Sequence, residues 1–211
     1  MKALIIVAHP DDAELALGGT IAMLRIRGVE VTVAIATVSE KNLDIRKLRV
    51  AAAEKAAALL GHQLFWIASG KFDQVEEIPQ CDLIGHIDNL VEETDPSIVF
   101  THTEHDSHFD HIKLSTAVTA SSRRWPSKTL YHFGPNEHRT QKVFEFVPNT
   151  YVVIDDFLDR KLEALRCYEY HSQGFRSLNY DAVQRRDRYY GERVGCIAAE
   201  TLQLVSQVNF F

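Results

Sequence analysis

The sequence is poor in cysteine, and its three cysteines form no recognisable disulfide or metal-binding pattern. Cys81, Cys167 and Cys196 are odd in number, lie far apart and include no Cys-x-x-Cys spacing. A disulfide framework needs an even set of cysteines, and a thiolate zinc site needs closely spaced pairs. The sequence therefore indicates neither kind of site, and we expect the three thiols to lie in the core.

Positive charge and long apolar runs are scarce as well. Lys and Arg total 23 against 29 Asp and Glu, a formal net charge of −6, so no overall positive field attracts nucleic acid or an anionic membrane surface. The apolar run over residues 3–8 is shorter than a signal-peptide core or a membrane helix of about 20 residues. We therefore expect a cytoplasmic protein without nucleic-acid or membrane partners, and nothing here excludes a homo-oligomer.

Short β-branched runs alternate with segments of helical spacing along the whole chain. The runs expected to form strands are 4–8, 31–37, 64–68, 97–102, 129–133 and 150–154. The first, second and fourth are apolar nearly throughout, as in strands that helices cover on both faces. Helical spacing of apolar residues occurs over 17–24, 48–59, 83–90, 158–165 and 194–201. This alternation predicts a Rossmann-like three-layer α/β/α fold with a mostly parallel sheet, in a single domain over residues 1–211.

Glycines mark particular points of this fold. Gly28 and Gly61 stand just before the second and third expected strands, where helix ends favour a residue that tolerates positive φ. Gly18 and Gly19 might suggest a phosphate-binding loop, but Gly-x-Gly-x-x-Gly is absent and the pair falls inside the first expected helix. We expect this pair to allow close helix packing near the functional site. Two loop-like stretches, 69–82 and 134–149, are expected to border a substrate cleft.

Two clusters of His and Asp follow two of the expected strands. The first strand ends at His9-Pro10-Asp11-Asp12, and the fourth leads into a second cluster over residues 105–111. Ligands of open parallel sheets bind beyond the carboxyl ends of the strands, so the two segments can converge. A catalytic zinc takes three protein ligands, often imidazole or carboxylate, and keeps one position for water. Two His and one Asp fit that count.

The spacing within each cluster suggests divided roles. Adjacent side chains point in different directions, so one of Asp11 and Asp12 can bind a metal while the other handles protons. His108 and His111 are three residues apart at an expected helix start, which places them on one side, and Asp110 can orient a ligating imidazole. Taken singly, the clusters have simpler explanations: a helix cap at Asp12, and a solvated loop capped by Asp110. Their joint position at strand ends favours the metal site.

Together these segments resemble the signatures of a known family. The first reads Ala8-His9-Pro10-Asp11-Asp12 with Glu14 and Gly18-Gly19-Thr20, and the second reads His108-Phe109-Asp110-His111 with Asp106 before it. Both are similar to motifs of the LmbE-like, or PIG-L-like, zinc-dependent de-N-acetylases of N-acetylglucosamine-containing substrates. Weaker matches, among them Lys161 and Ala199-Glu200, extend the resemblance over nearly the whole chain. Departures from frequent family residues occur at Ala13, Ala52 and Phe109.

The resemblance implies a metal centre with distinct roles for its residues. Zn²⁺ is the implied metal, with Fe²⁺ or another divalent ion as alternatives, and its implied ligands are His9, Asp12 and His111. Asp11 is implied to act as the general base and His108 to stabilise the oxyanion. None of the departures falls on a ligand position.

The reaction implied by this resemblance is hydrolysis of the acetamide of a small amino-sugar substrate to a free amine and acetate. Arg49 matches a substrate-contacting position, and we assign Glu14 to the same group, although a favourable charge in a first helical turn also explains it. Asp110 joins the catalytic group. Two alternatives stay open: a non-sugar N-acyl substrate, because the motifs do not specify the acyl donor, and a non-catalytic Rossmann-like binding module.

Overall fold

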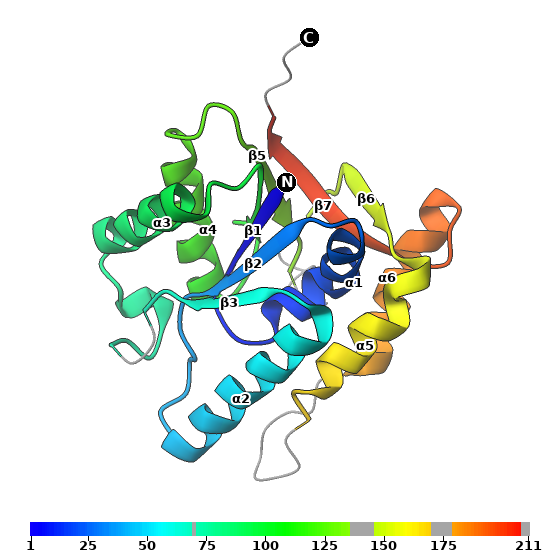
Figure 1. Ribbon diagram of the computed structural model, residues 1–211, viewed down its shortest axis with the longest axis horizontal. Coiled ribbons are helices and arrows are strands. Elements are labelled where there is room, and N and C mark those ends of the chain that lie inside the picture. The colour runs from blue at the N-terminus through cyan, green and yellow to red at the C-terminus, as the bar shows by residue number, and fades with distance from the viewer. Residues whose placement is uncertain (69–70, 136–145, 170–178, 208–211) are drawn as a thin grey trace.

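Seven strands form one sheet in the order β3-β2-β1-β4-β5-β7-β6 (Figure 1). The structure is a computed structural model and describes residues 1–68, 71–135, 146–169 and 179–207. The five parallel strands are β1 (Lys2–Val7), β2 (Glu30–Ile35), β3 (Gln63–Trp66), β4 (Ile98–His102) and β5 (Thr129–Phe133). Strand β7 (Ala199–Ser206) runs antiparallel to β5 and to β6 (Thr150–Val153). The prediction of a mostly parallel sheet is confirmed.

Helices cover both faces of this sheet (Figure 1). On one face, α1 (Asp12–Ile26), α2 (Leu43–Leu60) and α5 (Leu158–Arg166) contribute to one hydrophobic cluster. On the other, α3 (Gln80–Thr94) and α4 (Phe109–Ser122) contribute to a second cluster. Ile5 and Ile6, neighbours in β1, belong to different clusters and are both fully buried. The first strand is thus covered on both sides, as its unbroken apolar run predicts, and the three-layer fold is confirmed.

Helix α1, which begins at the first His and Asp cluster, is broken at Leu17, whose φ of −133° is not helical. In an unbroken helix the amides of Gly19 and Thr20 would donate to carbonyls four residues earlier. Both amides donate to the carboxylate of Glu200 in β7, over 2.9 and 2.7 Å. A side chain from the far end of the chain therefore satisfies backbone groups at the break.

A buried ion network surrounds this carboxylate. Lys161 Nζ lies 2.7 Å from Glu200 Oε1 and 2.6 Å from Asp187 Oδ2, and all three side chains are almost inaccessible to solvent. Arg186, in α6 (Tyr180–Val194), donates both to Asp187 and to the carbonyl of Leu15. Because an unpaired buried charge costs several kcal/mol, the two cations and two anions offset one another. The weaker family matches at Lys161 and Glu200 thus have a structural role.

Close packing explains the glycine pair in α1. A Cβ atom on Gly18 would lie 2.8 Å from Lys161 Cγ, and one on Gly19 would lie 2.7 Å from Ile154 Cγ2. Both distances are too short for ordinary carbon contacts, so α1 approaches α5 and the segment after β6 only because these side chains are missing. The prediction of close helix packing is confirmed.

The structure corrects two expectations and adds a helix that was not expected. Residues 194–201 do not form a helix: α6 ends at Val194, Gly195 takes a φ of 79°, and β7 begins at Ala199. Two apolar residues and a threonine at helical spacing are too few to distinguish a helix from a strand. Helix α6 itself was not expected, because it is mostly polar. The cysteines are not core thiols either, since Cys81 is exposed and Cys167 and Cys196 are partly so.

The two stretches expected to border a cleft are described in part. Residues 69–70 and 136–145 lie outside the described residues, while 71–82 contains a short 3₁₀ helix (Val75–Glu77) and the start of α3. The amide of Glu76 donates to Asp110 over 2.8 Å, so this stretch borders the second His and Asp cluster. Across the described part of the chain, no helix has the length and apolar character to cross a membrane.

Candidate metal centre

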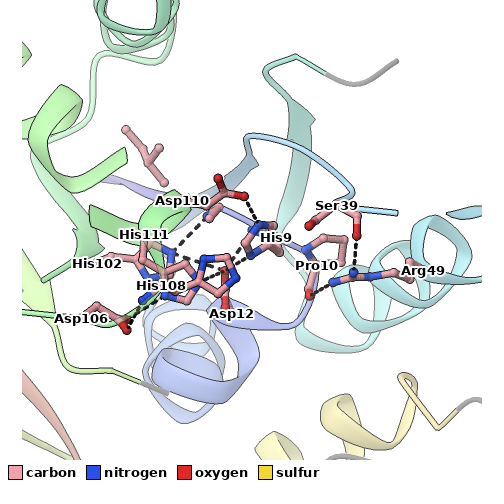
Figure 2. Close-up of polar contacts among 12 residues, drawn as sticks. His9, Pro10, Asp12, Ser39, Arg49, His102, Asp106, His108, Asp110 and His111 are labelled. Carbon is pink, nitrogen blue, oxygen red and sulfur yellow. Dashed lines mark hydrogen bonds and ion pairs between the residues drawn. The ribbon is translucent and has the colours of Figure 1, made fainter. Parts of the chain in front are cut away.

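The two clusters meet at the carboxyl edge of the sheet, between the neighbouring strands β1 and β4 (Figure 2). After β1 the chain turns directly into α1, and Asp11 takes the left-handed conformation with a φ of 91°. A positive φ is uncommon for residues other than glycine, and the cases that occur are concentrated at functional sites. The turn carries Asp11 and Asp12 to the same edge as the second cluster, which supplies His108, Asp110 and His111 at the start of α4.

Asp110 orients the ring of His9. Its Oδ2 lies 2.8 Å from His9 Nε2, and its Oδ1 accepts the amide of Glu76. Burial raises the pKa of Asp110, but the hydrogen bonds from His9 and Glu76 outweigh it and hold the pKa below its usual value. With Nε2 engaged, the other nitrogen of His9 is turned towards Asp12, and Nδ1 lies 3.6 Å from Asp12 Oδ2. Asp110, one of the residues predicted from the sequence, thus hydrogen-bonds to the candidate ligand His9 and orients its ring.

Asp106 holds the ring of His111 in the same manner. Its Oδ2 lies 2.8 Å from His111 Nδ1, while its Oδ1 accepts the amides of Ser107 and His108. His111 Nε2 is buried without a hydrogen-bond partner among the described residues and lies 3.4 Å from Asp12 Oδ2. Asp106 is a residue to which sequence reasoning gave no role, although its place just before the second motif was a signal.

These residues fit a divalent metal. In a tetrahedral zinc site with bonds of about 2.0–2.1 Å, donor atoms lie about 3.3 Å apart, close to the 3.6 and 3.4 Å that separate Asp12 Oδ2 from the nitrogens of His9 and His111. Within the described residues, the buried Nε2 of His111 makes no hydrogen bond and faces Asp12 Oδ2 at 3.4 Å, so a cation between the two atoms would engage both. Each imidazole is backed by a carboxylate, which is the usual arrangement of histidine ligands.

Two compact groups of possible ligands occur within the described residues, and both include His111. In each group the donor atoms all lie within 4.8 Å of one another: one group is His9, His108 and His111, and the other is Asp12, His102 and His111. The predicted trio of His9, Asp12 and His111 draws on both groups and is not itself one of them. His102, the last residue of β4, was not among the predicted site residues.

Asp11 lies at the site but is only half-buried. Burial and the neighbouring Asp12 carboxylate raise the pKa of Asp11 to about 8, against the opposing effect of Arg49. The guanidinium of Arg49 also donates to the carbonyls of Ser39 and Pro10, over 3.2 and 3.4 Å, and so joins the loops that follow β1 and β2 (Figure 2). The structure therefore places Asp11 next to a candidate ligand and Arg49 against the loop that carries both aspartates.

His108 and Glu14 differ in their access to the site. His108 is exposed, and its ring stacks on that of His111 at a centroid distance of 4.5 Å, with His9 4.9 Å away. Glu14 is 3% exposed, and its Oε1 lies 3.9 Å from Nε2 of the buried His62. His108 is thus open to a substrate, whereas the burial of Glu14 supports the alternative explanation, a favourable charge in the first turn of α1.

Comparisons with known proteins agree with this geometry. A family model described as PIG-L, GlcNAc-PI de-N-acetylase, matches residues 4–122. The probable N-acetyl-alpha-D-glucosaminyl L-malate deacetylase 2 of Bacillus cereus is 26% identical over 203 residues, which cover 87% of this chain and 90% of that protein.

Two solved structures share the fold. The N,N'-diacetylchitobiose deacetylase of Pyrococcus horikoshii has a TM-score of 0.77 at 21% identity, covering 97% of this chain and 83% of that one. The 4-carboxy-2-hydroxymuconate hydratase of Pseudomonas putida has a TM-score of 0.80 at 19% identity, covering 100% and 98%. These likenesses show the fold alone, since the second protein is described by a different reaction. The family model, however, spans both His and Asp motifs and more than half of the 211 residues, so the chain belongs to the PIG-L family, as its two motifs predict.

Proposed function

We propose that this protein is a metal-dependent hydrolase that removes the acetyl group from a small N-acetylglucosamine-type sugar. The observation that carries the proposal is the pair of carboxylate-backed imidazoles, His9 and His111, that face Asp12 next to a second carboxylate, Asp11. Membership of a de-N-acetylase family and the names of the relatives support the substrate class. Zn²⁺ is the proposed metal, with Fe²⁺ as the alternative, and the cytoplasm is the proposed compartment.

The residues divide the work of amide hydrolysis. A divalent cation held by His9, Asp12 and His111 would supply Lewis acidity for the carbonyl and lower the pKa of water. Asp11 accepts the proton of the attacking water and passes it to the nitrogen as the C–N bond breaks. His108 donates a hydrogen bond to the carbonyl oxygen as that oxygen becomes negative. The water oxygen ends on acetate, and the sugar leaves as a free amine.

A substrate panel tests the proposal. We expect acetate release from N-acetylglucosaminyl malate or N,N'-diacetylchitobiose with a kcat/KM at least about tenfold above that for N-acetyl amino acids, because specific polar contacts give discrimination of this order or more. Acetate and free amine are measured on metal-loaded protein, with Asp11→Asn as the blank. Preference for the N-acetyl amino acids would favour the non-sugar alternative. Absence of acetate release from every compound would reject the deacetylase.

His108→Ala tests the role of the exposed imidazole. If His108 acts on the transition state, kcat and kcat/KM should fall by similar factors of about 100 to 1,000, with KM and metal content nearly unchanged. Steady-state kinetics, metal analysis and a melting curve on the same variant provide the measurement. A change confined to KM would indicate substrate binding instead, and a lowered Tm with activity preserved would indicate a purely structural residue.

A further inference from the structure

His102 lies among the candidate metal ligands, although it belongs to neither of the two His and Asp motifs. It is the last residue of β4 and is 1% exposed. Its Nε2 accepts the backbone amide of Ala8 over 3.1 Å and lies 3.4 Å from Asp12 Oδ2 (Figure 2). Its ring stacks on His111, with centroids 4.0 Å apart and planes 16° apart. One side chain therefore contacts the end of β1 and two of the three candidate ligands.

Its position alone would suit a metal ligand, since His102 forms a compact group with Asp12 and His111. The hydrogen bond from Ala8 argues against that role. An imidazole nitrogen has one lone pair in the plane of its ring, and the amide proton of Ala8 occupies the lone pair on Nε2. Binding a cation through this atom would leave a buried amide at the end of β1 without an acceptor.

The stacking contact adds a positional constraint. His111 is held at its Nδ1 edge by Asp106 and against one face by the ring of His102, so both its tilt and its depth are set. The ring of Phe133 in β5 packs edge-on against the ring of His102, with centroids 4.7 Å apart and planes at 60°. His102 is held by Ala8 at the end of β1 and by Phe133 in β5. Its ring therefore fixes the position of His111 relative to these two strands.

We propose that His102 is a positioning residue of the metal centre and not a fourth ligand: it fixes the end of β1 through the Ala8 amide and the ring of His111 through stacking. This inference rests on the proposed function, because it presumes a cation at His9, Asp12 and His111. It implies that only three side chains bind the cation, which leaves a position open for water.

The test compares His102→Phe with His102→Gln and with a matched control. Phe keeps a flat ring for stacking but removes the acceptor, whereas Gln offers an oxygen near the place of Nε2. His132→Phe is the control, because His132 is also a buried histidine, in the neighbouring strand β5, and contacts Thr119 instead of the ligands. Zinc affinity is measured by competition with a chromophoric chelator, alongside metal stoichiometry, the Tm of the metal-free protein and the visible spectrum of the Co²⁺ form.

We expect His102→Phe to bind one metal per chain with an affinity 10–100-fold below that of the wild type, as is typical when a residue supporting a ligand is lost. His102→Gln should recover part of this loss, because it restores an acceptor for the Ala8 amide but not the ring that stacks on His111, and its Co²⁺ spectrum should match that of the wild type. His132→Phe should leave the zinc affinity unchanged, even where it lowers Tm.

Two results would overturn the inference while leaving the proposed function intact. One is an unchanged zinc affinity in His102→Phe, and the other is a loss as complete as that in His111→Ala, which would make His102 a ligand. If His102→Phe does not fold, His102→Gln decides alone: a Co²⁺ spectrum altered in coordination number identifies a ligand and rejects positioning. A wild-type chain that binds no divalent metal would reject the proposed function and this inference with it.

Discussion

Replacing Asp11 by Asn should lower kcat at least about 100-fold while metal content and Tm stay close to those of the wild type, because a general base contributes typically 10²–10⁴-fold. The two side chains are nearly the same size, so the turn after β1 should survive. Asn cannot accept the proton of the attacking water. Burial and the Asp12 carboxylate raise the pKa of Asp11 to about 8, and a cation at the adjacent site acts in the opposite sense.

The neighbouring carboxylate provides the matched control for this experiment. Asp12→Asn makes the same chemical change one residue later but at a candidate ligand, so it should reduce metal affinity, which Asp11→Asn should not. Kinetics at saturating metal and metal analysis after dialysis separate the two variants. An Asp11→Asn enzyme with wild-type kcat would exclude Asp11 as the base, and loss of its metal would place Asp11 among the ligands.

The three proposed ligands should each be indispensable for metal binding. His9→Ala, Asp12→Ala and His111→Ala remove one donor from a site of three, and we expect each variant to retain only a small fraction of the roughly one metal per chain bound by the wild type. Elemental analysis after dialysis against a weak chelator gives the measurement. Full retention of metal in all three variants would end the assignment.

Asp106 and Asp110 allow a graded comparison with the ligands themselves. Each backs one imidazole through a 2.8 Å hydrogen bond, so Asp106→Ala and Asp110→Ala should weaken metal binding about 10–100-fold without abolishing it. Both should regain metal when excess Zn²⁺ is supplied, whereas the ligand variants should remain poorly loaded.

The sequence predicted the location of the candidate site, because one physical rule places both His and Asp motifs at the same edge of the sheet. Strand ends of a parallel sheet share one edge, so the sequence indicates that the segments of His9, Asp12 and His111 can converge, and the pairing of β1 with β4 brings them together. The partners of the imidazoles followed no such rule. Asp110 is next to His111 in sequence but bonds His9, 101 residues away, and Asp106 bonds His111 instead. Which carboxylate meets which ring depends on the start of α4 and on the tilt of the helix.

Other features left too weak a signal. His102 closes an apolar strand, and a histidine there is equally consistent with a satisfied core residue, because its partners at Ala8 and His111 come from other elements. Strand β7 was missed because it alternates only partly between buried and half-exposed residues. Lys161, Asp187 and Glu200 belong to residue types that usually lie at the surface. Only their contacts with one another explain why they are buried here.

The break in α1 connects the first helix to the last strand of the chain. Glu200, which accepts the amide of Gly19, follows it by 181 residues, and it belongs to a strand that must insert between β5 and β6. A growing chain that already carries both His and Asp motifs therefore lacks the contact that shapes the helix beginning at Asp12. Contacts this distant in sequence form slowly, since the intervening chain must be ordered first. We therefore expect this contact between the last strand and the first helix to form late in folding.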